Sequence, residues 1–169
     1  YEAPPMVPGI ERVDLQGAVV VPGLIDAHTH SFEGGLYSPG ADLSEANTRN
    51  DVFNILCENE PLSGLRFAWR FDETLIDEGR FPTRAELDAI SPEPLLLRRV
   101  CGHSCQVNSA ALAAIDWRGE PPADDTGLLR GRQNDIAAHW FHRQLDDEAI
   151  LRCYDRAIDL APFNANAWY

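Results

Sequence analysis

Two strand-type runs and several helix-type stretches predict an α/β fold for this chain of 169 residues. Ala18–Val21 is an unbroken apolar run rich in β-branched residues, which is typical of a strand buried on both faces. Gln133–Leu145 carries apolar residues at helical spacing. Leu65–Phe71 carries a large apolar side chain at every second position, which predicts a half-buried strand. The apolar side chains expected on one face of that strand are Leu65, Phe67, Trp69 and Phe71.

The beginning of the chain contains short strand-type segments separated by turn signals. A proline-rich start leads into the strand-like stretch Ile10–Leu15, and Gln16–Gly17 is a turn signal. After the apolar run, Pro22–Gly23 interrupts the pattern and Leu24–His30 predicts a second short strand. Ser31–Asn50 is rich in Gly, Ser, Pro and Asn, so we expect a loop there, either the wall of a pocket or a plain connector.

Capping signals and apolar spacing predict the later elements. Residues 51–59 carry a short helical stripe. Thr83 followed by Glu86 is the pattern of a helix N-cap with a capping box. In chain order, the other elements expected are a strand at Pro94–Val100, a helix at Asn108–Ile115, and a helix after Asp146–Asp147 that runs to about Ala161 and ends at Pro162.

The composition excludes several partner classes. With 27 acidic and 14 basic residues the net charge is −13, which argues against nucleic acid or an anionic membrane as a partner. No apolar run approaches the roughly 20 residues of a membrane span. The four cysteines are irregularly spaced, which predicts reduced thiols and a cytoplasmic protein. A zinc site made of Cys101, Cys105, His139 and His142 is an alternative, but its spacing is poor and buried thiols are favoured.

A pair of histidines follows the apolar run. Side chains alternate along a strand, so Asp26, His28 and His30 are expected to point to the same side. Two imidazoles at positions i and i+2 can hold one divalent metal ion without distorting the backbone. The alternative is that both are surface or hydrogen-bonded histidines without a metal.

The sequence from Val20 to His30 resembles the first barrel strand of the amidohydrolase superfamily, and further stretches resemble its YtcJ-like branch, amidohydrolase family 3. The resemblance implies a (β/α)8 barrel with a small β-domain and an inserted α+β segment. It divides the chain into a strand region of the small β-domain (1–17), the first barrel strand with its loop (18–50), the α+β insertion (51–132) and a helical segment (133–169). The further matching stretches are Phe71–Thr74, Phe81–Pro92, Leu96–Ser104, Val107–Leu112 and Thr126–Arg130.

The resemblance also implies an activity, namely metal-dependent hydrolysis of a non-peptide C–N bond in a small amide-type substrate. A divalent metal, with zinc preferred, would activate water and polarise the substrate carbonyl. His28 and His30 match the metal-binding pair, and Asp26 matches an acid that supports them. On the substrate side the matching residues are His103, Asn108 and Asp72, for which structural roles are the alternative.

The family completes its site with ligands on later strands, which a chain of this length does not contain, since a full barrel needs roughly 250 residues. We therefore expect an N-terminal portion that is inactive alone. The alternative is a non-catalytic α+β binding module. Its C-terminal segment, Tyr154–Tyr169, resembles part of a tetratricopeptide repeat, and the other interpretation of that segment is a plain helix followed by a tail. Because Val19–Ile25 is apolar on both faces, we also expect a homo-oligomer to cover it.

Overall fold

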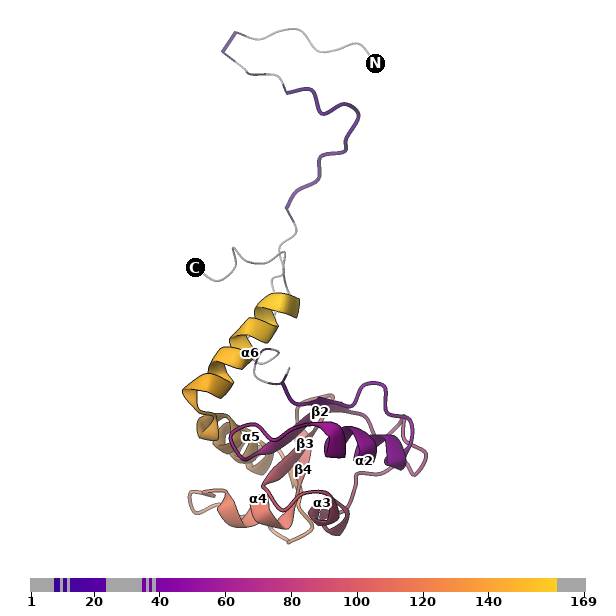
Figure 1. The fold of residues 1–169 in the computed structure, drawn as a ribbon, viewed down its shortest axis with the longest axis vertical. Helices are drawn as coiled ribbons and strands as arrows, with labels where there is room; N and C mark the ends of the chain where they lie inside the picture. The colour runs from indigo at the N-terminus through magenta and orange to yellow at the C-terminus, as the bar shows by residue number, and fades with distance from the viewer. Residues whose placement is uncertain are drawn as a thin grey trace.

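A mixed five-stranded sheet is the centre of the computed structural model, which describes residues 8–9, 11, 13–23, 35, 37 and 39–160, with side chains up to residue 155 (Figure 1). The first three strands in space run parallel to one another, and the fourth strand is antiparallel to both the third and the fifth. The described part of the chain therefore confirms the predicted α/β class. In spatial order the strands are β1 (Ala41–Asp42), β2 (Arg66–Phe71), β3 (Leu95–Arg99), β4 (Ser104–Val107) and β5 (Leu128–Arg130).

Helices cover both faces of this sheet. The first core cluster includes side chains from α2 and α3 on one face, and the second includes side chains from α4 and α5 on the other. Figure 1 shows a further helix, α6, that projects away from the sheet. The helices are α2 (Arg49–Glu58), α3 (Arg84–Ile90), α4 (Ser109–Ala114), α5 (Arg132–Gln144) and α6 (Asp147–Leu160).

Side-chain caps explain where α2, α3 and α4 begin. Thr83 accepts a hydrogen bond from the backbone N–H of Glu86, whose carboxylate accepts one from the N–H of Thr83, so the predicted capping box is confirmed. Thr48 and Asp51 form a second capping box at the start of α2, which the sequence analysis did not identify. Each box satisfies N–H groups that the first turn of a helix leaves without partners.

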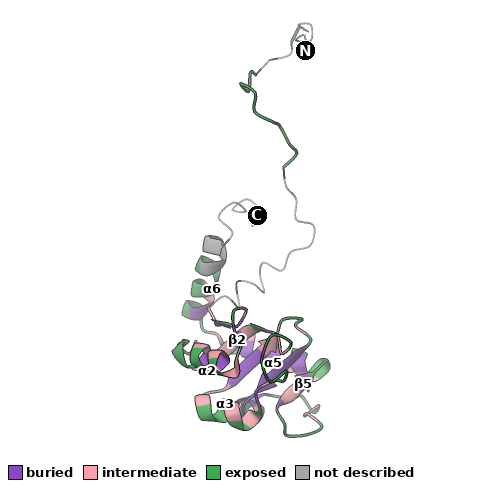
Figure 2. Cartoon of the chain, turned by 90° about the vertical axis from the view of Figure 1, so that its right-hand side faces the viewer, coloured by how far each residue is buried: buried purple, intermediate pink, exposed green. Residues whose placement is uncertain are grey.

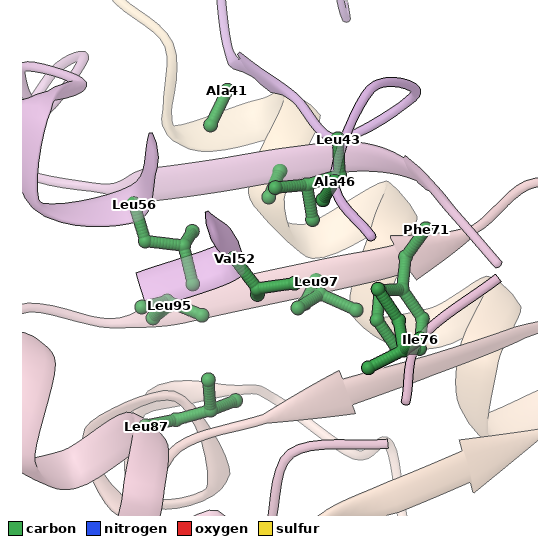
Figure 3. Close-up of a cluster of buried hydrophobic side chains, with 11 residues drawn as sticks. Ala41, Leu43, Ala46, Val52, Leu56, Phe71, Ile76, Leu87, Leu95 and Leu97 are labelled. Atoms are coloured by element: carbon green, nitrogen blue, oxygen red, sulfur yellow. The ribbon is translucent and has the colours of Figure 1, made fainter. Parts of the chain in front are cut away.

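The first core cluster fills the space between the sheet and helices α2 and α3 (Figure 3). Leu95 and Leu97 point to this face from β3, while Leu87 approaches from α3 and Leu56 from α2, and all four are fully buried. Alternate residues of β3 point to the opposite face, where Leu96 joins the second cluster. Both faces of the central strand are therefore buried, as its unbroken leucine run requires.

Phe71 is not on the face that the alternation of Leu65–Phe71 predicts. Leu65 and Phe67 belong to the second cluster, whereas Phe71 and Ala68 pack in the first. The cause is an irregularity in β2, where the register with β3 shifts between Ala68 and Phe71 and Arg70 adopts a φ of 60°. One extra residue of this kind reverses the direction of the side chains that follow it.

The apolar run near the N-terminus also differs from its prediction. Gln16–Gly17 forms the expected turn, with the N–H of Ala18 donating to the carbonyl of Leu15. Val19–Val21, however, form no strand and are strongly exposed, Val19 to 86%. Figure 1 shows this segment well apart from the sheet. A strand buried on both faces needs neighbours on both sides, and the described residues place none beside it.

The C-terminal helices agree with their predicted positions. Helix α5 covers the predicted range Gln133–Leu145 to within one residue at each end, and α6 follows Asp146. Ala149 and Cys153 of α6 are buried, whereas Leu151 and Tyr154 are exposed. Figure 2 shows both buried and exposed stretches along this helix. Among the described residues no helix is both long and apolar enough to cross a membrane. The predicted repeat-like tail beyond residue 160 lies outside the described residues.

Candidate functional site

The three residues predicted at the metal centre, Asp26, His28 and His30, lie outside the described residues. The part of the chain that is described contains no group of three or more His, Cys, Asp or Glu side chains able to hold a metal ion. In chemical terms, the two imidazoles fit a divalent metal, because neutral imidazole is the commonest metal ligand. A catalytic zinc usually takes about three protein ligands, one more than this pair supplies.

The alternative zinc site at Cys101, Cys105, His139 and His142 is excluded by the same finding. Cys105 is fully buried in the second core cluster, and this burial raises the pKa of its thiol to about 12. Only the thiolate binds metal, so a thiol that stays protonated near neutral pH is a packing residue. No disulfide joins any of Cys57, Cys101, Cys105 and Cys153, all of which are among the described residues.

Asp72 lies where β2 ends, at the edge formed by the carboxyl ends of β1, β2 and β3. Its carboxylate accepts hydrogen bonds from the hydroxyl (2.7 Å) and the backbone N–H (3.0 Å) of Thr74. These bonds, the hydroxyl bond above all, lower the pKa of Asp72. The guanidinium of Arg99 is 4.0 Å away, and its own stronger partner is Glu73, at 2.7 Å. Asp72 thus shapes the turn that follows β2.

His103 lies at the same edge of the sheet as Asp72. It is exposed in the turn that joins β3 to β4, and its carbonyl accepts a hydrogen bond from the N–H of Gly131 at 3.3 Å. Asp72 and His103 therefore share an edge of the sheet but come from separate strand ends. Their assignment to substrate binding stays a prediction.

Asn108 lies at the opposite edge, where β4 ends and β3 begins. Its side chain is fully buried, and its amide oxygen accepts from the N–H groups of Leu95 (3.0 Å) and Ala111 (2.9 Å). Its amide nitrogen donates to the carbonyls of Ser91 (3.0 Å) and Glu93 (2.8 Å). All four hydrogen-bonding positions of the amide are occupied within the protein. These contacts tie α4 to the start of β3, and the structure does not bring Asn108 together with Asp72 and His103.

A cluster of side chains that sequence reasoning missed lies on the face of the sheet covered by α5. Tyr37 stacks on Phe67 with ring centroids 4.9 Å apart and contacts His142 of α5 at 5.3 Å. The guanidinium of Arg98 lies over the same tyrosine ring at 5.0 Å. Trp69 is 6.4 Å from it. These residues are far apart in the sequence, so no local pattern could have identified the cluster.

Comparison with known proteins identifies the family. Residues 11–162 match the family model described as the amidohydrolase family. The chain belongs to the amidohydrolase family. The matched range includes Asp26, His28 and His30 as well as every strand of the sheet.

Relatives named as amidohydrolases or deformylases cover most of this chain. It is 32% identical to the N-substituted formamide deformylase of Arthrobacter pascens over 90% of its own length and 31% of that protein. It is 31% identical to YtcJ of Bacillus subtilis, which is named as an amidohydrolase, over 72% of its length and 24% of that protein. The YtcJ-like resemblance is thereby confirmed.

A solved structure supports the same assignment. The chain superposes on an uncharacterized metal-dependent hydrolase from Pyrococcus horikoshii with a TM-score of 0.66 and 26% identity. The match covers 81% of this chain and 28% of that one. The chain therefore spans less than a third of the length of each of these three proteins.

Proposed function

We propose that this chain supplies the first metal-binding strand of a hydrolase that cleaves the C–N bond of a small amide-type substrate. The observation that carries the proposal is the family match over residues 11–162, which includes the sequence Asp26-Ala-His-Thr-His30. The names of the relatives, a deformylase of N-substituted formamides and an amidohydrolase, agree with this bond type. In this proposal Leu24–His30 is the first strand of a (β/α)8 barrel, and the described sheet is a segment inserted after it.

His28 and His30 are the proposed ligands of a divalent metal, with zinc preferred over iron, nickel and manganese. When bound, the metal supplies a Lewis acid that polarises the substrate carbonyl and makes water a better nucleophile. Asp26 is proposed to orient a ligand rather than to bind metal itself, as carboxylates beside metal-binding histidines commonly do. Both imidazoles must be neutral to bind, so metal affinity is expected to fall below about pH 6.5.

Two imidazoles do not complete a catalytic zinc site, so we propose that further ligands come from elsewhere in the functional protein. The purified chain should therefore bind metal more weakly than a complete site does and should not turn over an N-substituted formamide. A measured release of formate by the 169-residue chain, abolished by His28→Ala, would show that the site is complete and that this part of the proposal is wrong.

The metal site itself is tested by equilibrium dialysis of the purified, metal-free chain against saturating free zinc, with the bound metal measured by mass spectrometry. We expect one zinc per chain in the wild type and none in His28→Ala/His30→Ala. A matched control is His103→Ala/His139→Ala, which removes two exposed histidines and should retain the metal. Equal zinc binding by all three proteins, or none by the wild type, would favour a non-catalytic binding module.

A further inference from the structure

A groove of about 760 Å³ lies along the outer side of α5. One wall is the exposed face of that helix, and the other is the turn after α4 that carries Asp116 and Arg118. Ile136 and Trp140 supply its apolar surface, and both pack against the second core cluster. Trp140 also packs edge-on against the ring of Phe141, with centroids 5.2 Å apart. Pockets for small molecules usually measure roughly 300–1,000 Å³, so this groove has space for one.

The turn that forms the second wall is fixed to the rest of the fold. The indole N–H of Trp117 donates to the carbonyl of Leu112 at 3.1 Å, and the N–H of Glu120 donates to the carbonyl of Trp117 at 2.9 Å. The carboxylate of Glu120 accepts two hydrogen bonds from the guanidinium of Arg132, which joins this turn to the start of α5. The two walls are therefore held at a set spacing, as a preorganised binding site requires.

Two arginines line this groove with their charge unpaired. Within the described residues, the guanidinium groups of Arg118 and Arg143 form no ion pair and no hydrogen bond. Asp116 and Asp135 also line the groove, but their carboxylates accept from other donors, namely the N–H of Arg118 at 3.0 Å and the amide of Asn134 at 3.0 Å. The groove thus offers two positive charges to a ligand, in a chain whose net charge is −13.

The backbone of Arg118 supports a role for its side chain. Its φ is 52°, in the left-handed region that glycine adopts without strain and that larger residues rarely occupy. Non-glycine residues held in this region are concentrated at ligand-binding and active sites. Folding alone would favour glycine at this position, so the arginine is better explained by its guanidinium.

We propose that this groove binds a small organic anion that carries a planar aromatic ring. The guanidinium groups of Arg118 and Arg143 bind its phosphate or carboxylate oxygens, because arginine donates paired N–H groups to both kinds of anion. The half-buried ring of Trp140 stacks on the ring of the ligand. Since both contacts contribute, an inorganic anion or a neutral aromatic compound should bind more weakly. This site does not depend on the proposed metal centre.

1-Naphthyl phosphate is a suitable probe, and its binding to the 169-residue chain is measured by calorimetry at constant ionic strength. We expect 1-naphthol, which lacks the charge, and inorganic phosphate, which lacks the ring, each to bind at least about tenfold more weakly. 1-Naphthoate distinguishes a carboxylate from a phosphate as the preferred anion, and tighter binding of either naphthyl anion than of 1-naphthol supports the proposal. If 1-naphthol or inorganic phosphate binds as tightly as 1-naphthyl phosphate, the proposal is overturned.

Substitutions of the two arginines separate binding from folding. Arg118→Gly removes the guanidinium and relieves the positive φ, so binding of 1-naphthyl phosphate should weaken at least about fivefold while the midpoint of urea unfolding does not fall. Arg143→Met, at an exposed position of α5, should weaken binding by a similar factor. The control Arg70→Met removes an exposed arginine outside the groove, also at a positive φ (60°), and should bind the probe like the wild type. Unchanged binding in either groove variant, or an equal loss in the control, would overturn the proposal.

Discussion

Replacing Asn108 with alanine tests whether this residue holds the fold together or serves the substrate. The change removes the N-cap of α4, which is worth about 1 kcal/mol. It also leaves the N–H of Leu95 and the carbonyls of Ser91 and Glu93 without their partner. Each such group costs roughly 1–3 kcal/mol, less where water can enter. We therefore expect the unfolding free energy to fall by about 3–4 kcal/mol.

Urea unfolding followed by circular dichroism measures this loss, and with a slope of about 2 kcal/mol per molar the midpoint should fall by about 1.5–2 M. Ser109→Ala is the matched control, because its hydroxyl bonds to Asp88 at an exposed position and its loss should cost under about 1 kcal/mol. A loss below about 1 kcal/mol for Asn108→Ala would refute the reasoning. If Asn108→Ala also failed to bind the amide-type substrate, Asn108 would again be a candidate for substrate binding.

Two other predictions concern backbone strain and acid stability. Gly127→Ala should destabilise the chain by more than about 2 kcal/mol, because φ is 80° and the new Cβ would collide with the carbonyl of Val107. Gly79→Ala, at a φ of 61° in open space, should cost about 1 kcal/mol, and equal losses in urea unfolding would contradict this account. Hydrogen bonding to Arg80 lowers the pKa of Glu86 in the fold, so its stabilisation is present above the unfolded pKa of about 4.5 and lost as the pH falls. Glu86→Gln should cost about 1 kcal/mol near pH 7, and this cost should shrink progressively as the pH falls below about 4.5. A loss independent of pH would disprove the linkage.

Local signals in the sequence predicted most of the long elements. Thr83 with Glu86 identified the start of α3, and the apolar run at Pro94–Val100 identified β3, because both depend on residues close together in the chain. The strands β1, β4 and β5 have two to four residues and are too short to show a period. The reversal at Phe71 depends on the bulge near Arg70, which tertiary packing determines.

The same distinction applies to the candidate sites. His28 and His30 are two residues apart, so a strand pattern was enough to predict them as a pair. Arg118 and Arg143 come from the turn after α4 and from α5, and they line one groove only because the fold brings these elements together. Asn108 was predicted at the start of a helix, but its bonds to Ser91 and Glu93 required the folded sheet.

The proposed metal pair is tested most directly by X-ray absorption at the zinc edge on the zinc-loaded chain. The account predicts two imidazole nitrogens at about 2.0–2.1 Å from the metal, with oxygen ligands completing the shell. That imidazole signal should disappear in His28→Ala/His30→Ala and remain in His103→Ala/His139→Ala. A zinc shell of oxygen alone in the wild type, or an imidazole signal that survives the loss of His28 and His30, would contradict the account.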